Sequence, residues 1–139
     1  MANKRNVTVR MKADLEYESR NPQGNLVNID MYDPEHKHAQ SPMDLLLSAL
    51  GGCASVDAVL MMKKKRKEVV DFYVEVEGTR NEGVPAFYTD IELKFILVSP
   101  DATEEEFAKV VALSVDKYCS VASSLKSNIT YVSEVKRPS

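Results

Sequence analysis

The sequence is poor in the residues and motifs that carry common enzymatic chemistry. It contains only two cysteines and two histidines, and it has no glycine-rich phosphate loop, no nucleophile elbow and no metal-ligand spacing motif. His36 and His38 form an isolated His-x-His in a polar loop, with only Asp33 and Glu35 as acidic neighbours. No cysteine is close to this pair in the sequence, so we predict no metal site.

The sequence also lacks a long apolar run and a surplus of basic residues. No stretch approaches the ~20 apolar residues needed to cross a bilayer, and no apolar signal-peptide core follows the basic start of the chain. We therefore expect a cytoplasmic protein that binds no membrane. The net charge of −3 disfavours a nucleic-acid partner. The one basic run, Lys63 to Lys67, follows a helical pattern, and cations at that position complement the helix dipole.

The size and composition are those of one soluble globular domain, which we predict to span residues 1–139. The chain is 44% hydrophobic and 28% charged. Structural disulfides are rare in a reducing compartment, so the two cysteines are expected to be free thiols, a redox pair or buried small side chains.

The N-terminal residues have the patterning of strands. Apolar and polar residues alternate from Val7 to Leu15, which is typical of a strand with one buried face. Residues 19–25 form a turn by composition, and a second short strand is expected from Leu26 to Met31. A polar loop over residues 33–40 follows.

A long helix is predicted to begin just after Ser41. Ser41 is a suitable N-cap, Pro42 suits the first helical position, and Asp44 completes an aspartate version of the capping box. Gly51 and Gly52 lie inside the helix at a cost of roughly 1 kcal/mol each relative to alanine, so we expect a backbone or a ligand to approach closely there. Apolar positions recur at helical spacing over about 25 residues: Leu46, Ala49, Leu50, Cys53, Val56, Leu60 and Met61.

The second half predicts two strands, two helical pieces and a final strand. Thr103 and Glu106 form a capping box that begins a helix, and the helical pattern breaks around Cys119 before a second, shorter piece. The expected ranges are strands over residues 69–78, 87–98 and 129–135, with helical segments between 103 and about 126. The order ββ-α-ββ-α-α-β predicts an α+β fold.

The long helix also bears on oligomeric state. It is apolar over much of its circumference, and a chain of 139 residues has little else with which to cover it. A second copy of the chain would bury the remaining surface, so we expect a homodimer.

Two segments around the cysteines resemble the OsmC/Ohr family. Residues 41–53, SPMDLLLSALGGC, are similar to its first-cysteine helix, and residues 117–125, KYCSVASSL, to its second-cysteine motif. The helix-strand-strand-helix order between them fits as well. The similarity is greatest to the branch with Pro-Met-acid before the helix and Gly-Gly-Cys within it.

This resemblance implies an OsmC-like fold, an intertwined homodimer with active sites at the subunit interface, and peroxide reduction by thiols without metal, flavin or other cofactor. Cys53 would attack an organic hydroperoxide or hydrogen peroxide and become a sulfenic acid. Cys119 would resolve it as a disulfide, and an external dithiol would reduce the pair.

A peroxidatic cysteine must react as a thiolate, and Cys53 lies about three turns inside its helix, too far for the helix dipole to help. In the family an arginine of the N-terminal hairpin supplies the positive charge across the dimer. Arg20 is the position that fits best, Arg10 is an alternative in mid-strand, and Glu18 could anchor Arg20.

The sequence departs from the family pattern at Met43, where the family places a glutamate that pairs with the arginine. Asp44 is one residue later but points away from Cys53, so we interpret it as a capping residue. Asp57 lies one turn after Cys53 on the same face. Its carboxylate would oppose ionisation of the thiol unless it orients an arginine or a water molecule.

Cys119 is expected at the start of the second helical piece. A cysteine at a helix N-cap receives backbone N–H groups, which favour its thiolate. The family usually has a proline after this cysteine, whereas this chain has Ser120, which could also cap the helix.

Two alternatives remain open at this point. Met43 in place of glutamate favours a dimer with little peroxidase activity that binds a small molecule or serves a structural role. A thiol-based transferase or hydrolase would need a histidine base, and only His36 and His38, both in a loop, are available.

Overall fold

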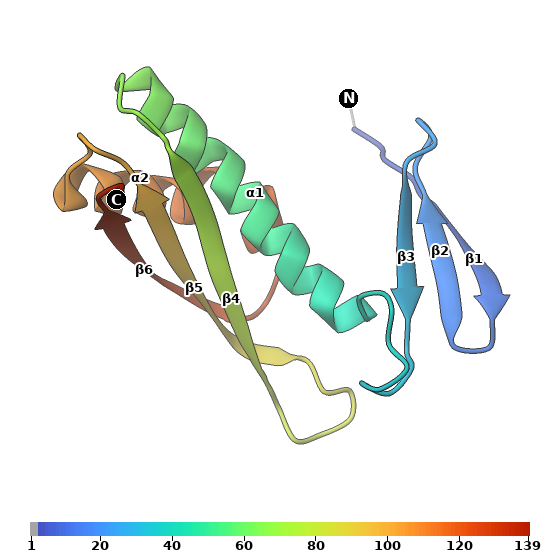
Figure 1. Ribbon diagram of the computed structural model, residues 1–139. Helices are drawn as coiled ribbons and strands as arrows, with labels where there is room; N and C mark the ends of the chain where they lie inside the picture. The colour runs from blue at the N-terminus through green and yellow to red at the C-terminus, as the bar shows by residue number, and fades with distance from the viewer. Residues whose placement is uncertain (1–2) are drawn as a thin grey trace. The chain divides into compact units, whose positions relative to one another are not determined.

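The elements along the chain are three strands, one long helix, two strands, a helix that continues into a π-helical turn, a short helix and a final strand (Figure 1). The computed structural model describes residues 3–139. The first two residues lie outside the described residues. They belong to the predicted domain of residues 1–139 and to the basic N-terminal segment in which we expect no signal peptide. The chain divides into two compact units between Leu46 and Leu47, and each is described by itself.

The N-terminal unit contains three strands, although the sequence predicted two. Strands β1 (Thr8–Ala13), β2 (Glu16–Arg20) and β3 (Leu26–Asp30) form an antiparallel sheet in that order. The missed turn is Asp14–Leu15, which pairs Ala13 with Glu16. This turn contains none of the Asn-Gly or Gly-X pairs that usually mark a two-residue hairpin. The alternation of apolar and polar residues from Val7 to Leu15 therefore predicts one continuous strand.

Helix α1 (Pro42–Lys64) begins where the sequence predicted. The hydroxyl of Ser41 accepts a hydrogen bond from the backbone N–H of Asp44 at 3.1 Å, and the Asp44 carboxylate accepts one from the Ser41 N–H at 3.3 Å. This reciprocal pair satisfies two backbone donors that the helix leaves free at its start. Lys63 and Lys64 lie in the last turn, which confirms the interpretation of the basic run as a helix terminus.

The C-terminal unit is built on a second sheet with the order β4-β5-β6. Strand β4 (Asp71–Arg80) pairs antiparallel with β5 (Tyr88–Val98), and β6 (Asn128–Lys136) pairs parallel with β5. The parallel pair requires a crossover, which the intervening helical segments provide. This mixture of helices and mostly antiparallel sheet confirms the α+β class.

The helical crossover has three parts. Helix α2 (Glu104–Leu113) begins with the predicted capping box, in which Thr103 and Glu106 exchange side-chain to backbone hydrogen bonds. It continues into the π-helical turn η1 (Ser114–Tyr118), and α3 (Ser120–Ser124) follows with Cys119 as its N-cap. The predicted break at Cys119 is therefore confirmed.

Helices α1 and α2 cover the same face of the second sheet. Phe72, Val74 and Val76 alternate along β4 and so share one face. A Cβ on Gly51 of α1 would lie 3.0 Å from Val76 and 3.3 Å from Val74, and the ring of Phe107 of α2 packs edge-on against Phe72 with centroids 6.2 Å apart. The core between helices and sheet is completed by fully buried residues of β5: Ile91, Leu93, Phe95 and Leu97.

The buried side of α1 differs from the apolar stripe that the sequence analysis singled out. The residues of α1 with buried side chains or backbone are Leu50, Gly51, Ala54, Ala58 and Met62. Four stripe residues instead remain solvent-exposed: Ala49, and Leu46, Val56 and Leu60 with relative exposures of 38%, 60% and 57%. The C-terminal unit by itself therefore leaves Val56 and Leu60 of α1 uncovered.

By length and composition alone, α1 is long and apolar enough to cross a membrane. The expectation that no stretch approaches this length and composition is therefore wrong for this helix. The core helix of a soluble protein meets the same two criteria, and Leu50, Ala54 and Ala58 have no solvent-exposed surface.

Candidate active site

The two cysteines of the chain come together in the C-terminal unit, although 65 residues separate them in the sequence. Cys53 is half-buried in the middle of α1, and Cys119 is 3% exposed at the N-cap of α3. Both are free thiols, and Cys53 lies near enough to Cys119 to act on its thiol. The position of Cys119 follows from the end of η1, where the backbone turns from helical to extended (φ −78°, ψ 104°) before α3 begins.

The environment of Cys119 makes its thiol a weaker acid. Burial raises the pKa of Cys119, and the neighbouring Cys53 adds to the rise. The backbone N–H of Ala122 donates to the Cys119 sulfur at 3.4 Å and acts in the opposite direction, as expected for a helix N-cap. The predicted cap is therefore present and favours the thiolate of Cys119, but burial outweighs it, so the net effect is a raised pKa.

Gly51 and Gly52, the residues before Cys53, have different surroundings. The close approach of Val74 and Val76 to Gly51 confirms that a strand packs against α1 at this point, since a side chain there would push the strand away. Nothing lies within 4 Å of a Cβ placed on Gly52. Gly52 instead borders a groove of about 320 Å³ between α1 and β4, whose other wall residues include Leu47 and Ser55.

The predicted arginine belongs to the N-terminal unit, whereas both cysteines belong to the other. Arg20 ends β2 with about half of its side chain exposed, and its guanidinium lies 3.9 Å from the carboxylate of Glu18. Arg10 is opposite Glu18 in the β1–β2 ladder. The three side chains and Thr8 line a cavity of about 260 Å³. The structure thus pairs Glu18 with Arg20, as the sequence suggested.

The two aspartates of α1 have separate surroundings. Asp44 caps the helix, in agreement with the sequence analysis. Asp57 is half-buried one turn after Cys53, and its side chain forms no hydrogen bond or ion pair within residues 3–139. No group of three or more His, Cys, Asp and Glu residues in that range is arranged to hold a metal ion.

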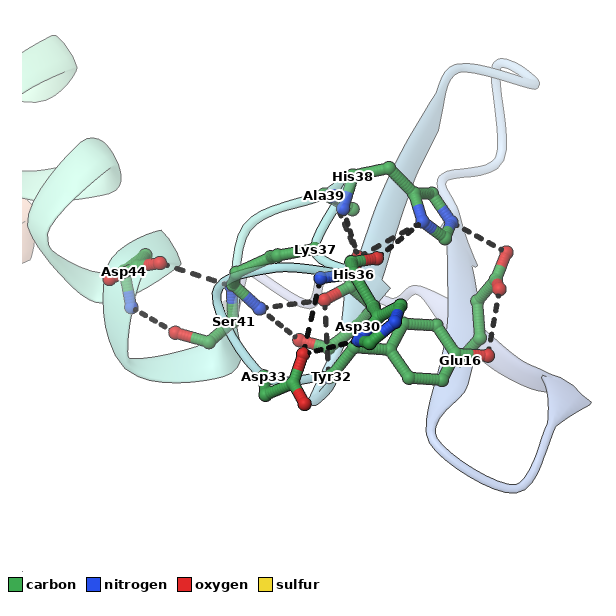
Figure 2. A network of polar contacts seen from close by, with 10 residues as sticks. All are labelled: Glu16, Asp30, Tyr32, Asp33, His36, Lys37, His38, Ala39, Ser41 and Asp44. Carbon is green, nitrogen blue, oxygen red and sulfur yellow. Dashed lines mark hydrogen bonds and ion pairs between the residues drawn. The ribbon is translucent and has the colours of Figure 1, made fainter.

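A polar network that the sequence did not predict fixes the loop between β3 and α1 (Figure 2). At its centre is Asp30, whose side chain is 0% exposed. Its carboxylate accepts hydrogen bonds from the Lys37 ammonium at 2.7 Å and from the backbone N–H groups of His38 and Ala39 at 2.9 and 2.7 Å. Burial disfavours its charge, but these donors outweigh burial and hold the pKa of Asp30 at about 2.

Glu16 and His38 form the outer part of this network. The His38 ring lies 3.3 Å from the Glu16 carboxylate through Nε2 and 3.7 Å from Asp30 through Nδ1, and the Tyr32 hydroxyl donates to Glu16 at 3.2 Å. Hydrogen bonding to Glu16 raises the pKa of His38, and the same bond lowers the pKa of Glu16. Hydrophobic periodicity gives no signal for such a network, because its members are dispersed over residues 16–39.

This network predicts a pH-dependent contribution to stability. Glu16 contributes above its ordinary pKa of 4.5 and loses its contribution as the pH falls; His38 contributes below 6.5 and loses its contribution as the pH rises. The pair therefore stabilises most between these values. We expect His38→Gln to lower the melting temperature by about 2–4 °C in that window and by less near pH 9. Thermal unfolding of both proteins from acidic to alkaline pH measures this.

A matched control is His36→Gln, since the His36 ring pairs with Asp33 at 2.6 Å but both side chains are largely exposed. We expect a smaller effect from it at every pH. An equal loss for the two variants, or a loss for His38→Gln that grows toward alkaline pH, would contradict the assignment.

Comparison with known proteins places these features in context. A family model described as OsmC-like protein matches residues 34–134. Protein YhfA of Escherichia coli K12 is 42% identical over 99 residues, which cover 70% of this chain and 74% of YhfA. The crystal structure of a hypothetical protein from Aquifex aeolicus VF5 matches with a TM-score of 0.86 and 29% identity, covering 99% of this chain and all of that one.

A more distant match is the organic hydroperoxide resistance protein OhrB of Bacillus subtilis. It has a TM-score of 0.63 and 16% identity, and the match covers 96% of this chain and 98% of OhrB. At this identity the likeness shows a common fold alone.

Proposed function

Because this chain belongs to the OsmC-like protein family, we propose that it reduces organic hydroperoxides and hydrogen peroxide with the thiol pair Cys53 and Cys119. The observation that carries the proposal is the meeting of these two thiols, the only cysteines of the chain, at residues that match the family's two motifs. The role would be defence against oxidative stress.

The chemistry requires only the two thiols and an external reductant. The Cys53 thiolate attacks the distal peroxide oxygen, the O–O bond breaks, and the alcohol leaves after taking up a proton. Cys53 is now a sulfenic acid. The Cys119 sulfur attacks that of Cys53, water leaves, and a disulfide forms. A dithiol then reduces the disulfide and is itself oxidised.

The unequal surroundings of the thiols support this division of roles. Burial and the raised pKa keep the Cys119 thiol protonated, so it is a poor first nucleophile for peroxide. Cys53 is the more accessible of the two, half-buried where Cys119 is 3% exposed. Cys119 adjacent to Cys53 is well placed for the second step.

Arg20 is proposed to supply the positive charge that Cys53 needs, from the partner subunit of a homodimer with active sites at the interface. The exposed apolar face of α1, with Val56 and Leu60, supports burial against a second copy. Glu18, which already pairs with Arg20, takes the anchoring role of the glutamate that Met43 replaces. We further propose that residues 1–139 act as one OsmC-like domain in the cytoplasm.

The direct test is thiol loss in the native protein. We expect ~1 equivalent of cumene hydroperoxide to remove both thiols of the reduced protein within seconds to minutes, and a dithiol to restore them, because each turnover converts the pair to a disulfide. Free thiols are counted with a chromogenic reagent after rapid removal of peroxide. Survival of both thiols, while a control thiol peroxidase is oxidised under the same conditions, would overturn the proposal.

A second candidate function is a dimer that binds a small apolar molecule with little turnover. The observation that favours it is the groove beside Gly51 and Gly52, together with Met43 at the family's glutamate position. It predicts slow thiol loss and no dependence of that loss on Arg20. A thiol transferase or hydrolase gains no support, since His36 and His38 pair with carboxylates of the N-terminal unit.

A further inference from the structure

A second cavity, of about 310 Å³, lies against Cys119. It is formed by η1, α3 and the start of β6, and its walls include Lys117, Cys119, Ser123 and Ile129. Cys53, the partner thiol, does not line it. Of the two cysteines, only Cys119 therefore lines this cavity.

The shape of the cavity follows from the π-helical turn. In η1 one extra residue per turn widens the helix just before Cys119, a feature that is rare and often found at functional sites. The Tyr131 hydroxyl donates to the carboxylate of the wall residue Asp116 at 2.5 Å, so η1 is tied to β6. The hydroxyl of Ser127, another wall residue, donates to the Tyr88 carbonyl at 2.7 Å, which ties it to β5. The walls are thus held by hydrogen bonds at two residues.

We propose that a dithiol reductant enters this cavity and attacks the Cys53–Cys119 disulfide at the sulfur of Cys119. This inference rests on the proposed function, which generates the disulfide, and it adds the route and the sulfur by which the disulfide is reduced.

The direction of attack supports this assignment. Thiol–disulfide exchange proceeds with three sulfurs nearly in line, so the attacking thiolate must approach one sulfur from the side opposite the other. A cavity lined by Cys119 but not by Cys53 offers such an approach to Cys119.

The chemistry of the leaving group points to the same sulfur. In the first exchange, which is the intermolecular step, attack on Cys119 expels Cys53, whereas attack on Cys53 would expel Cys119 as a buried thiolate. Burial raises the pKa of Cys119, and a thiol of higher pKa leaves more slowly.

Lys117 provides electrostatic help at the cavity. It is exposed and lines the cavity wall, and a cation there attracts the thiolate form of an incoming reductant. The lysine, whose ammonium lies 5.3 Å from the centroid of the Tyr118 ring, is one of two charged residues in the wall. The other, Asp116, accepts a hydrogen bond from Tyr131.

The electrons and atoms balance in two exchanges. The first thiolate of the dithiol forms a bond with the Cys119 sulfur, and the Cys53–Cys119 bond breaks with Cys53 leaving as a thiolate. The second thiol of the reductant then attacks its own sulfur in the mixed disulfide. Cys119 leaves toward the Ala122 N–H, and the dithiol has become a disulfide by losing two electrons.

The test uses a disulfide made without peroxide, so that it does not depend on the proposed peroxidase step. Diamide oxidises the full-length protein, and the rate of reduction by dithiothreitol is followed by thiol release. We expect Ser123→Trp, which fills the cavity from its exposed rim, to slow reduction by about tenfold or more, because access limits exchange. The control Ser124→Trp makes the same change on the same helix outside the cavity wall, and we expect less than about a twofold effect.

A monothiol identifies the sulfur that is attacked. Brief treatment of the oxidised protein with 2-mercaptoethanol, an acid quench and peptide mapping should place the adduct on residues 118–126, which contain Cys119. An adduct on Cys53, equal rates for the two tryptophan variants, or failure of diamide to form the disulfide would each overturn the inference. Absence of thiol loss to peroxide in the wild type, with diamide still forming the disulfide, would count against the proposed function alone.

Discussion

Replacement of Cys53 by serine is expected to reduce the consumption of cumene hydroperoxide to the rate of buffer. The Cys53 sulfur is the only atom that the proposed mechanism places against the peroxide, and the Cys119 thiol that remains is buried with a raised pKa. Since the thiolate is the nucleophile, Cys119 alone should react at least ~100-fold more slowly than the pair. Coupled peroxide consumption with an excess of dithiol measures this loss.

Cys119→Ser is the matched control and should behave differently. It retains the first step, so ~1 equivalent of peroxide should be consumed in a single fast turnover that leaves a sulfenic acid on Cys53. A dimedone adduct on residues 38–63 would identify that species. Fast peroxide consumption by Cys53→Ser would contradict the assignment of the peroxidatic sulfur, as would equal behaviour of the two variants.

Replacement of Arg20 by alanine is expected to slow the first step by about tenfold or more near pH 7. An opposite charge close to a thiolate favours ionisation by about 1–3 pK units, and the proposed mechanism assigns that charge to Arg20. Stopped-flow measurement of thiol oxidation gives the rate. Arg10→Ala, which changes the other arginine of the same cavity, is the control and should have a smaller effect.

Subunit mixing tests whether Arg20 acts across the dimer. A dimer of one Arg20→Ala subunit and one Cys53→Ser subunit holds one complete site only if the arginine of each subunit serves the cysteine of the other. We therefore expect the exchanged mixture to consume peroxide faster than the two variants measured separately. Peroxide reactivity unchanged by Arg20→Ala would instead favour the small-molecule binding function.

The start of α1 could be predicted closely because its signals are local. Ser41, Pro42 and Asp44 are adjacent in the sequence, and the capping box that they form depends on few residues beyond the first turn. Thr103 and Glu106 form a capping box that likewise predicts the start of α2. The strands of the second sheet were found within about two residues of their observed ends, since β-propensity and alternation agree there.

The remaining features depend on contacts between distant residues. The carboxylate of Asp30 is buried by a loop seven to nine residues further on, which no periodic pattern indicates. Burial raises the pKa of Cys119 and the backbone N–H groups at the helix N-cap lower it. Which effect is larger depends on how the side chain packs in the folded protein. The hairpin at Asp14–Leu15 was missed because its turn residues carry no characteristic signature.

Peptide mapping after peroxide treatment tests the central claim most directly. Reduced protein is treated with ~1 equivalent of cumene hydroperoxide, unreacted thiols are alkylated, and a tryptic digest is analysed by mass spectrometry without reductant. We predict a disulfide between the peptide of residues 38–63, which contains Cys53, and that of residues 118–126, which contains Cys119. Recovery of both peptides as separate alkylated thiols would contradict the claim that these two residues form a peroxide-reducing pair.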